Sequence, residues 1–121
     1  MPDGIKALVH ALLREPLQIW CGHELDPTYV YGIRTYLRSS QLKMHRDREG
    51  THQVSVIINV AQQGMVAPWP LHIEDHAGQR HRIFLSPGEM IFYEGERLLH
   101  GRPEPLDGES FSNVFVHYRL A

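Results

Sequence analysis

The sequence contains one cysteine, Cys21, among 121 residues. A single cysteine excludes an internal disulfide framework and a zinc site built from several thiolates, so a reducing, cytoplasmic location is expected. No stretch approaches the roughly 20 apolar residues of a membrane-spanning helix, and the N-terminus has no signal-peptide pattern, so we expect no membrane partner. The net charge of −2 gives no clear nucleic-acid footprint.

Lysine is also scarce, because only Lys6 and Lys43 accompany ten arginines. Arginine favours bidentate contacts with carboxylate or phosphate, so this bias indicates anionic ligands. Nine histidines are many for this length and form the compositional feature most relevant to function. The length suits one compact domain, residues 1–121, and scattered arginines without a self-complementary patch predict a monomer.

The first elements expected are a helix and a short strand. The stretch "IKALVHALLRE" has apolar residues at helical spacing, which predicts a packing helix over about residues 4–15 with Asp3 as its N-cap. Pro16 is expected to stop or kink this helix. The stretch "LQIW" then predicts a strand that opens a strand roll over about residues 17–120. With Leu8 and Leu12 of the helix, it is expected to leave apolar surface uncovered.

The rest of the chain predicts short strands separated by Pro/Gly turns about every eight to twelve residues. The strand-like stretches are rich in β-branched and aromatic residues: "YVYGIRTYLR", "HQVSVIINVAQ", "RHRIFL", "MIFYEG" and "FSNVFVHYRL". No internal repeat or low-complexity segment interrupts them. This pattern is typical of a mainly β sandwich or barrel-like roll rather than of an alternating α/β fold.

A candidate metal motif lies in "KMHRDREG", where His45 and Asp47 are two residues apart. In an extended segment, residues i and i+2 point to the same side, so one stretch can supply an imidazole and a carboxylate to one ion. Two histidines and one carboxylate on one face of a metal are the ligands of non-haem Fe(II) oxygenases. His100, in "RLLHGRP" just before a turn, is the best candidate for the third ligand.

Other polar and aromatic residues offer competing interpretations. His72, Asp75 and His76 form a rival metal cluster, but they flank a turn and are expected to lie at the surface. Trp69, between two prolines, is expected to pack over a sheet edge, and His117 is expected to have a structural role. A solvated polar turn is the simplest alternative for any of these short polar stretches.

Several motifs in order resemble the Fe(II)/2-oxoglutarate-dependent oxygenases, most closely their prolyl 4-hydroxylase-like branch. The resemblance covers roughly Tyr31 to Arg119. It includes a tyrosine nine residues before the first histidine ligand, then "HRD", a strand ending in "IIN", the turn and strand "SPGEMIFYEGERLLHG", and "SNVFVHY". The resemblance implies a double-stranded β-helix, which is a jelly-roll or cupin-like fold, with His45, Asp47 and His100 as iron ligands.

One position departs from the family that the sequence resembles. Members usually carry a basic residue nine or ten positions after the second histidine, where it pairs with the distal carboxylate of 2-oxoglutarate. This sequence has Glu109 and Ser110 there, and we expect Glu109 to point to solvent. Another arginine, a different co-substrate, hydroxyl groups or loss of activity would each explain the departure. The side chains predicted to bind the co-substrate are Arg102 as first choice, then Arg34 with Tyr36, and Asn113 on the last strand.

The resemblance implies a dioxygenase that binds Fe(II), uses 2-oxoglutarate as co-substrate, has ascorbate as a further candidate cofactor, and hydroxylates a C–H bond. The implied substrate is a peptidyl proline or another protein side chain, although Arg46 and Arg48 fit an acidic small molecule equally well. Two alternatives stay open: a cupin-like metalloenzyme that does not use 2-oxoglutarate, and a catalytically inactive metal- or ligand-binding module. The chain is short for the family, so a minimal domain or a fragment is expected.

Overall fold

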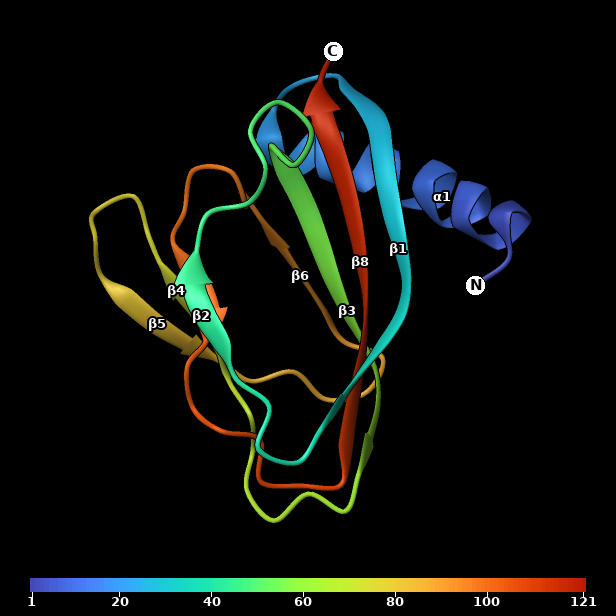
Figure 1. Ribbon diagram of the computed structural model, residues 1–121. Helices are drawn as coiled ribbons and strands as arrows, with labels where there is room; N and C mark the ends of the chain where they lie inside the picture. Colours follow the sequence, from blue (N-terminus) through green and yellow to red (C-terminus); the bar gives the residue numbers. More distant parts are fainter.

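Two four-stranded antiparallel sheets, β1-β8-β3-β6 and β2-β7-β4-β5, face each other in the computed structural model, which describes residues 1–121 (Figure 1). Successive strands pass from one sheet to the other over most of the chain, as in a double-stranded β-helix, so the predicted mainly β fold class is confirmed. The elements are α1 Asp3–Cys21, β1 Leu25–Leu37, β2 Leu42–His45, β3 Val54–Gln63, β4 Leu71–Glu74, β5 Arg80–Ile83, β6 Met90–Tyr93, β7 His100–Arg102 and β8 Ser110–Leu120.

Helix α1 is longer than predicted, because Pro16 lies inside it. Pro16 removes one helical hydrogen bond, but the fully buried side chain of Leu17 holds the next turn against the sheet. Of the two effects expected of Pro16, a stop does not occur, and the predicted strand "LQIW" is wrong. Asp3 lies in the first turn and does not cap the helix. The helix ends at Gly22, whose φ of 76° is in the left-handed region that glycine tolerates.

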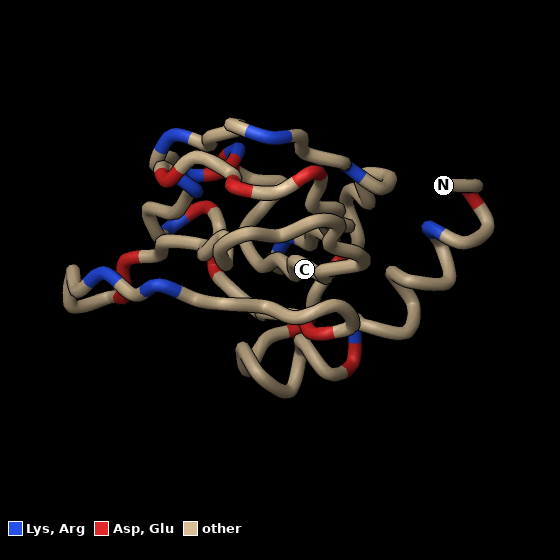
Figure 2. Tube along the Cα trace, turned by 90° about the horizontal axis from the view of Figure 1, so that it is seen from below, with Lys and Arg blue, Asp and Glu red and all other residues tan.

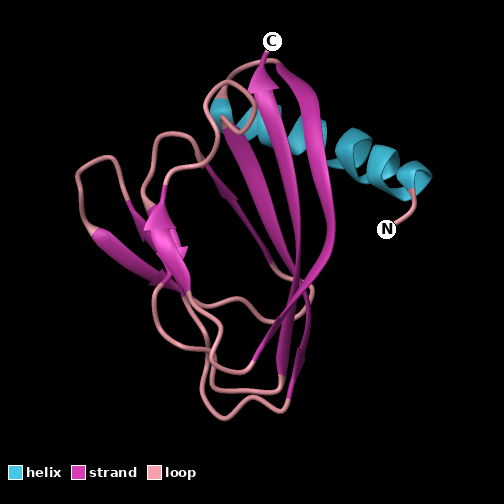
Figure 3. Ribbon diagram, viewed as in Figure 1, coloured by secondary structure: helices cyan, strands magenta, loops and turns pink.

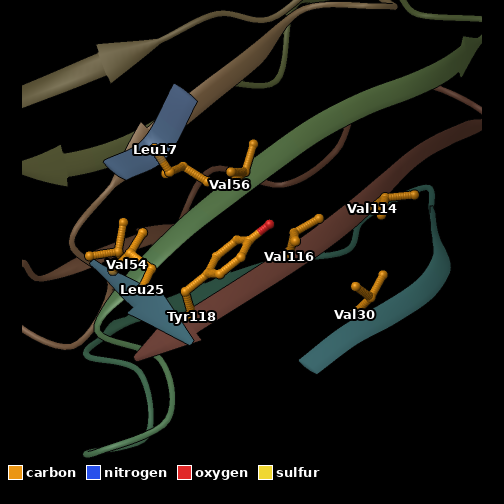
Figure 4. Close-up of a cluster of buried hydrophobic side chains, with 8 residues drawn as sticks. All are labelled: Leu17, Leu25, Val30, Val54, Val56, Val114, Val116 and Tyr118. Carbon is orange, nitrogen blue, oxygen red and sulfur yellow. The ribbon is translucent and has the colours of Figure 1, made fainter. Parts of the chain in front are cut away.

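From about Val9 onward, α1 covers the outer face of the larger sheet. Strand side chains alternate between the two faces of a sheet, so every second residue of β3 and β8 points toward the helix. Tyr118 donates its hydroxyl hydrogen to His10 O on the helix at 2.6 Å. The eight buried residues of this cluster are Leu17, Leu25, Val30, Val54, Val56, Val114, Val116 and Tyr118 (Figure 4).

The N-terminal end of α1 extends past β1, the edge strand of the larger sheet (Figure 3). Leu8 and Leu12 on the helix are 56% and 66% exposed, so apolar surface is left uncovered there. Acidic and basic residues are distributed over the whole trace (Figure 2). The structure contains no helix with the length and apolar character needed to cross a membrane.

The inner faces of the two sheets enclose two smaller apolar clusters, Ile57, Leu71, Ile73 and Tyr93 in one and Trp69, Leu106 and Phe111 in the other. Trp69 is a buried packing residue as expected, and its ring lies 5.4 Å from that of Tyr36 on the edge strand β1 and 5.2 Å from that of Phe111 on β8. The short strands β2 and β7 were not predicted from the sequence. They pair with each other at one edge of the smaller sheet, beside the first cluster.

Candidate metal centre

The candidate metal centre lies where the two short strands β2 and β7 meet. They pair antiparallel with His45 opposite His100, and the two imidazole rings lie 4.6 Å apart. Asp47 follows two residues after the end of β2, and its N–H donates to Gly95 O at 2.8 Å. This hydrogen bond holds the Asp47 side chain beside both rings. The structure thus brings together the three side chains predicted as ligands.

The donor atoms of these three residues converge on one point. Asp47 Oδ1 lies 3.3 Å from His45 Nε2 and 3.2 Å from His100 Nε2, and one ligand atom of each residue lies within 4.8 Å of the others. Ligand atoms about 2.1 Å from one ion and at right angles to one another stand about 3 Å apart. The spacing therefore suits a single divalent metal. No other group of His, Cys, Asp and Glu side chains converges in this way.

Each histidine is oriented by the ring nitrogen that faces away from Asp47. Nδ1 of His45 lies 2.7 Å from Lys43 O, and Nδ1 of His100 lies 2.8 Å from Leu98 O. A carbonyl oxygen only accepts hydrogen bonds, so in each neutral ring Nδ1 carries the proton and Nε2 keeps its lone pair. Three acceptor atoms then face one another with no proton between them. Metal-ligating histidines adopt this orientation, and a bound cation would relieve the repulsion.

The surroundings of Asp47 also fit a cation. Its second oxygen, Oδ2, is buried and has no hydrogen-bond partner. Burial alone would raise the pKa of Asp47, but the hydrogen bond and the charge that His100 offers whenever its Nε2 is protonated outweigh burial. The pKa is therefore lowered, and the carboxylate is ionised at neutral pH and can accept a cation in place of that proton. Gly95 leaves room for the carboxylate, because a Cβ there would lie 3.0 Å from Asp47 Cγ and closer still to Oδ2. These residues fit a metal held by two histidines and one carboxylate.

A cavity of about 310 Å³ opens from the metal centre between the two sheets. Its buried walls include Ile57, Leu71 and Tyr93, whereas Arg34 and Arg48 line it at the exposed rim. Burial raises the pKa of Tyr93 well above its ordinary value, so its phenol stays protonated at neutral pH. A cavity of this size accepts a small molecule beside the metal centre.

Arg102 is the buried cation of this cavity. It is 2% exposed, and its guanidinium lies 4.8 Å from the ring centroid of Trp69 and 4.9 Å from that of Phe111. Nη1 donates to Trp69 O at 2.7 Å, but no carboxylate lies within 4.0 Å. Burial lowers the pKa of Arg102 to about 10, so at neutral pH it is charged without a counter-ion. Glu109, at the position usually basic in the family that the sequence resembles, is exposed as predicted.

The other residues predicted to bind the co-substrate differ in their placement. Tyr36 is half-buried, lines the same cavity and packs on Trp69, with ring centroids 5.4 Å apart. Arg34 also lines the cavity, but at its exposed rim. Asn113 is fully buried and does not line the cavity, because its Oδ1 accepts a hydrogen bond from Asn59 Nδ2 at 3.0 Å. The structure therefore corrects the expectation that Asn113 faces the co-substrate.

The rival cluster of His72, Asp75 and His76 does not form. His72 Nε2 contacts Glu104, whereas His76 Nε2 contacts Glu94, so the two imidazoles engage separate carboxylates. His76 is exposed as expected, but His72 is buried, which corrects the surface position predicted for it. Burial follows from its place in β4, which lies between β7 and β5 in the smaller sheet.

Two further histidines of the cavity were missed. His117 was predicted to be structural, yet it lines the cavity together with His52, and their rings lie 3.9 Å apart. His117 Nδ1 is hydrogen-bonded to Ser55 Oγ at 2.6 Å, and burial, helped by the nearby charge of His52, lowers the pKa of His117 to about 3. The period of two along the last strand places His117 on the same face as Phe115, which is the signal that would have found it.

Comparisons with known proteins bear on the fold. No protein-family model matches the sequence, and no curated protein matches it. The chain is similar to the solved structure of AviO1 from Streptomyces viridochromogenes Tue57, with 16% identity and a TM-score of 0.66 over 88% of this chain and 56% of that one. It is also similar to an oxidoreductase of the 2OG-Fe(II) oxygenase family from Burkholderia pseudomallei (11% identity, TM-score 0.69, 94% and 57% covered). A third similar structure is a Pseudomonas putida prolyl-4-hydroxylase (16% identity, TM-score 0.67, 90% and 62% covered).

These likenesses concern the fold. At identities of 11% to 16% they show a shared double-stranded β-helix. The chain covers less than two thirds of the length of each of these three structures. The fold and the site together define a double-stranded β-helix that carries a candidate His-Asp-His metal centre.

Proposed function

We propose that this protein is a non-haem Fe(II)- and 2-oxoglutarate-dependent dioxygenase that hydroxylates a C–H bond. The observation that carries the proposal is that one cavity holds both the His-Asp-His triad and a buried arginine without a counter-ion. Two histidines and one carboxylate suit a metal that keeps open coordination positions. The arginine suits an anion bound beside that metal. A dicarboxylate co-substrate bound to Fe(II) would occupy the open metal positions with one carboxylate and pair with the arginine through the other.

His45, Asp47 and His100 would hold Fe(II) in this cavity. Iron bound there supplies the oxidative chemistry that couples decarboxylation of 2-oxoglutarate by O₂ to hydroxylation of the substrate. The protein contributes orientation, because two backbone carbonyls fix both imidazoles with Nε2 toward Asp47. Tyr93 packs edge-on against His100, with ring centroids 5.0 Å apart, and keeps water from that side of the ligand.

Arg102 would bind the distal carboxylate of 2-oxoglutarate. A buried charge without a partner is costly, and a charge-assisted hydrogen bond to a carboxylate removes that cost. Nη1 already donates to Trp69 O, so the edge formed by Nε and Nη2 is the one left for the anion. Tyr36 lines the cavity as well and would donate a second hydrogen bond from its phenol.

For the hydroxylated substrate two classes stay open, and one of them is an acidic small molecule, which Arg46 and Arg48 fit. A peptidyl proline or another protein side chain is the substrate class that the sequence resemblance implies. The likeness to a prolyl-4-hydroxylase is one of fold, at 16% identity, and supports the reaction class more than the substrate. The proposal of ascorbate as a further cofactor likewise comes from the sequence resemblance alone.

Metal analysis combined with a 2-oxoglutarate turnover assay tests this function. Protein reconstituted anaerobically with Fe(II) should bind a stoichiometric amount and release succinate when 2-oxoglutarate and O₂ are added. Fe(II) binding without succinate release would favour a cupin-like metalloenzyme instead. Absence of tight metal binding would indicate an inactive module.

Variants of the ligands locate the metal. His45→Ala, Asp47→Ala and His100→Ala should each abolish tight binding of Fe(II) or Mn(II), measured by titration calorimetry, because two ligands do not hold the ion. His72→Ala and His76→Ala are matched controls, since each removes a histidine that contacts a carboxylate outside the triad. Loss of binding in either control would contradict the assigned site.

A further inference from the structure

The arginines of this protein differ according to whether they line the metal cavity. Five of the ten have a carboxylate within 4.0 Å: Arg38, Arg80, Arg82, Arg97 and Arg119. None of the four that line the cavity has one: Arg34, Arg46, Arg48 and Arg102. Asp47 is the only carboxylate among the lining residues, and it faces the two histidine ligands. The cavity therefore carries positive charge that the protein itself does not neutralise.

Two of these four arginines have a role already. Arg102 is the deep cation assigned to the co-substrate, and Arg46 Nε donates to Arg97 O at 3.0 Å. Arg34 and Arg48, by contrast, take part in no side-chain hydrogen bond and no ion pair. Both are exposed, so they border the open end of the cavity and not its interior.

Aromatic rings support the two free guanidinium groups. The guanidinium carbon of Arg34 lies 4.9 Å from the ring centroid of Tyr31, and that of Arg48 lies 6.0 Å from the ring centroid of Tyr29. The two tyrosine rings are themselves stacked in parallel, with centroids 6.0 Å apart. Tyr31 is fixed further by a hydrogen bond of 3.1 Å between its hydroxyl and His52 Nε2. Guanidinium groups placed over rings keep their N–H edges available to an oxyanion.

From this placement we propose that the substrate of the cavity is a small organic acid whose carboxylate or phosphate group is bound at the rim by Arg34 and Arg48. The assignment rests on the oxygenase function proposed above and names its substrate class. Both arginines lie on the same cavity as the metal ligands, so an acid held at the rim can present its carbon skeleton to the metal. A neutral prolyl ring would leave both guanidinium groups without a partner.

The size of the cavity supports a small acid over a larger ligand. Its volume of about 310 Å³ has to hold the co-substrate and the reacting part of the substrate. Small-molecule sites usually measure ~300–1,000 Å³, so this one is at the lower end. Carboxylate and phosphate both match the two parallel N–H groups of a guanidinium, and the experiments below distinguish them.

Binding is tested first, without turnover. The ¹⁵N-labelled, Zn(II)-loaded protein is titrated with inorganic phosphate while the arginine Nε–H resonances are followed by NMR. We expect the Arg34 and Arg48 signals to shift, and the Kd for phosphate to rise roughly tenfold in Arg34→Gln and in Arg48→Gln. Arg38→Gln, which removes an ion-paired arginine outside the cavity, is the matched control and should bind phosphate normally.

Three results of this titration would overturn the assignment. Weakening confined to Arg102→Gln would place the anion at the deep arginine alone. Equal weakening in Arg38→Gln would indicate a general charge effect, and the absence of saturable phosphate binding would leave no rim site. Salt titration adds a check, because phosphate binding should weaken as ionic strength rises.

Turnover then separates the substrate class from the oxygenase function. Small carboxylic acids and phosphate esters, each paired with its neutral amide or alcohol, are assayed for stimulation of succinate release by the iron-loaded protein. We expect stimulation by acids only, reduced in Arg34→Gln and Arg48→Gln and retained in Arg38→Gln; whether carboxylates or phosphates stimulate identifies the anionic group. Succinate release with equal stimulation by neutral compounds overturns the substrate class alone. No succinate release from any mixture, with rim binding of phosphate intact, overturns the oxygenase function alone.

Discussion

Substitution of Gly95 by alanine should weaken metal binding without removing any ligand. A Cβ at Gly95 would lie 3.0 Å from Asp47 Cγ, whereas ordinary contact begins at 3.4 Å, so the Asp47 side chain would have to withdraw by about 0.4 Å at Cγ and by more at Oδ2. The added carbon cannot instead move away from Asp47, because Tyr93 Cε2 also lies 3.0 Å from it. A binding constellation tolerates displacements of only about 0.5 Å. Disturbing the support of a ligand typically costs 10- to 100-fold in metal affinity, and we expect about that loss.

Titration calorimetry with Mn(II) measures the effect directly. Gly4→Ala is the matched control, because a Cβ at Gly4 meets nothing within 4 Å and the residue lies on α1, far from the triad in the sequence. Thermal unfolding of the metal-free variants should be recorded alongside, so that a general loss of stability is distinguished from a displaced ligand. Gly4→Ala should keep wild-type affinity, and Gly95→Ala should fold yet bind Mn(II) more weakly.

An unchanged Mn(II) affinity in a folded Gly95→Ala protein would refute this reasoning. It would mean that the Asp47 carboxylate is not held against Gly95, and hence that it does not complete the triad where the structure places it. The hydrogen bond from Asp47 N to Gly95 O, at 2.8 Å, would then have no bearing on the ligand.

Three further outcomes are expected. Arg102→Ala should raise the KM for 2-oxoglutarate roughly 10²-fold, the scale of a charged hydrogen bond worth ~3 kcal/mol, whereas Arg38→Ala should leave it unchanged; a normal KM in Arg102→Ala would place the anchor elsewhere. Burial lowers the pKa of His117 to about 3, so the unfolded chain takes up this proton at a higher pH than the folded protein does. As the pH is lowered from 6.5 to 4, the free energy of unfolding should therefore fall by up to about 1.4 kcal/mol per pH unit. Urea unfolding should show a shallower fall in His117→Gln, and an equal slope would argue against His117 as the cause. Light scattering should give a monomer despite the exposed Leu8 and Leu12, and a concentration-independent dimer would contradict that prediction.

The strand pattern was predictable where the local sequence is decisive. Residues of β3 and β8 combine β-branched and aromatic side chains with a period of two, and both strands lie where the pattern predicts them. The predicted strand "LQIW" failed for a tertiary reason, because Leu17 is buried against the larger sheet and extends the helix through Pro16. The strands β2 and β7 have only four and three residues, too few for a periodic signal.

The candidate site also has a part that was predictable from the sequence, the metal ligands, and a part that was not, the rim of the cavity. His45 and Asp47 were predictable because two residues of one stretch share a side, and His100 followed from its place between a strand and a turn. The rim was not predictable, since Arg48 meets Tyr29 only through the folding of β1 against the segment that follows β2. Such contacts join residues far apart in the sequence and leave no local pattern.

The deep cation of the cavity, Arg102, lies on β7, whereas the position at which the family that the sequence resembles usually has its basic residue holds Glu109. Glu109 is exposed and its side chain lies against Gly64, so no charge reaches the cavity from there. Arg102 supplies one from β7 instead, two residues after His100 and on the same side of the strand. Phe111, from the last strand, then contributes a ring against the guanidinium and no charge of its own. Under the proposed function, a cation on β7 with an aromatic support on β8 would serve the cavity as a cation on β8 would, so Glu109 at that position does not by itself argue against activity.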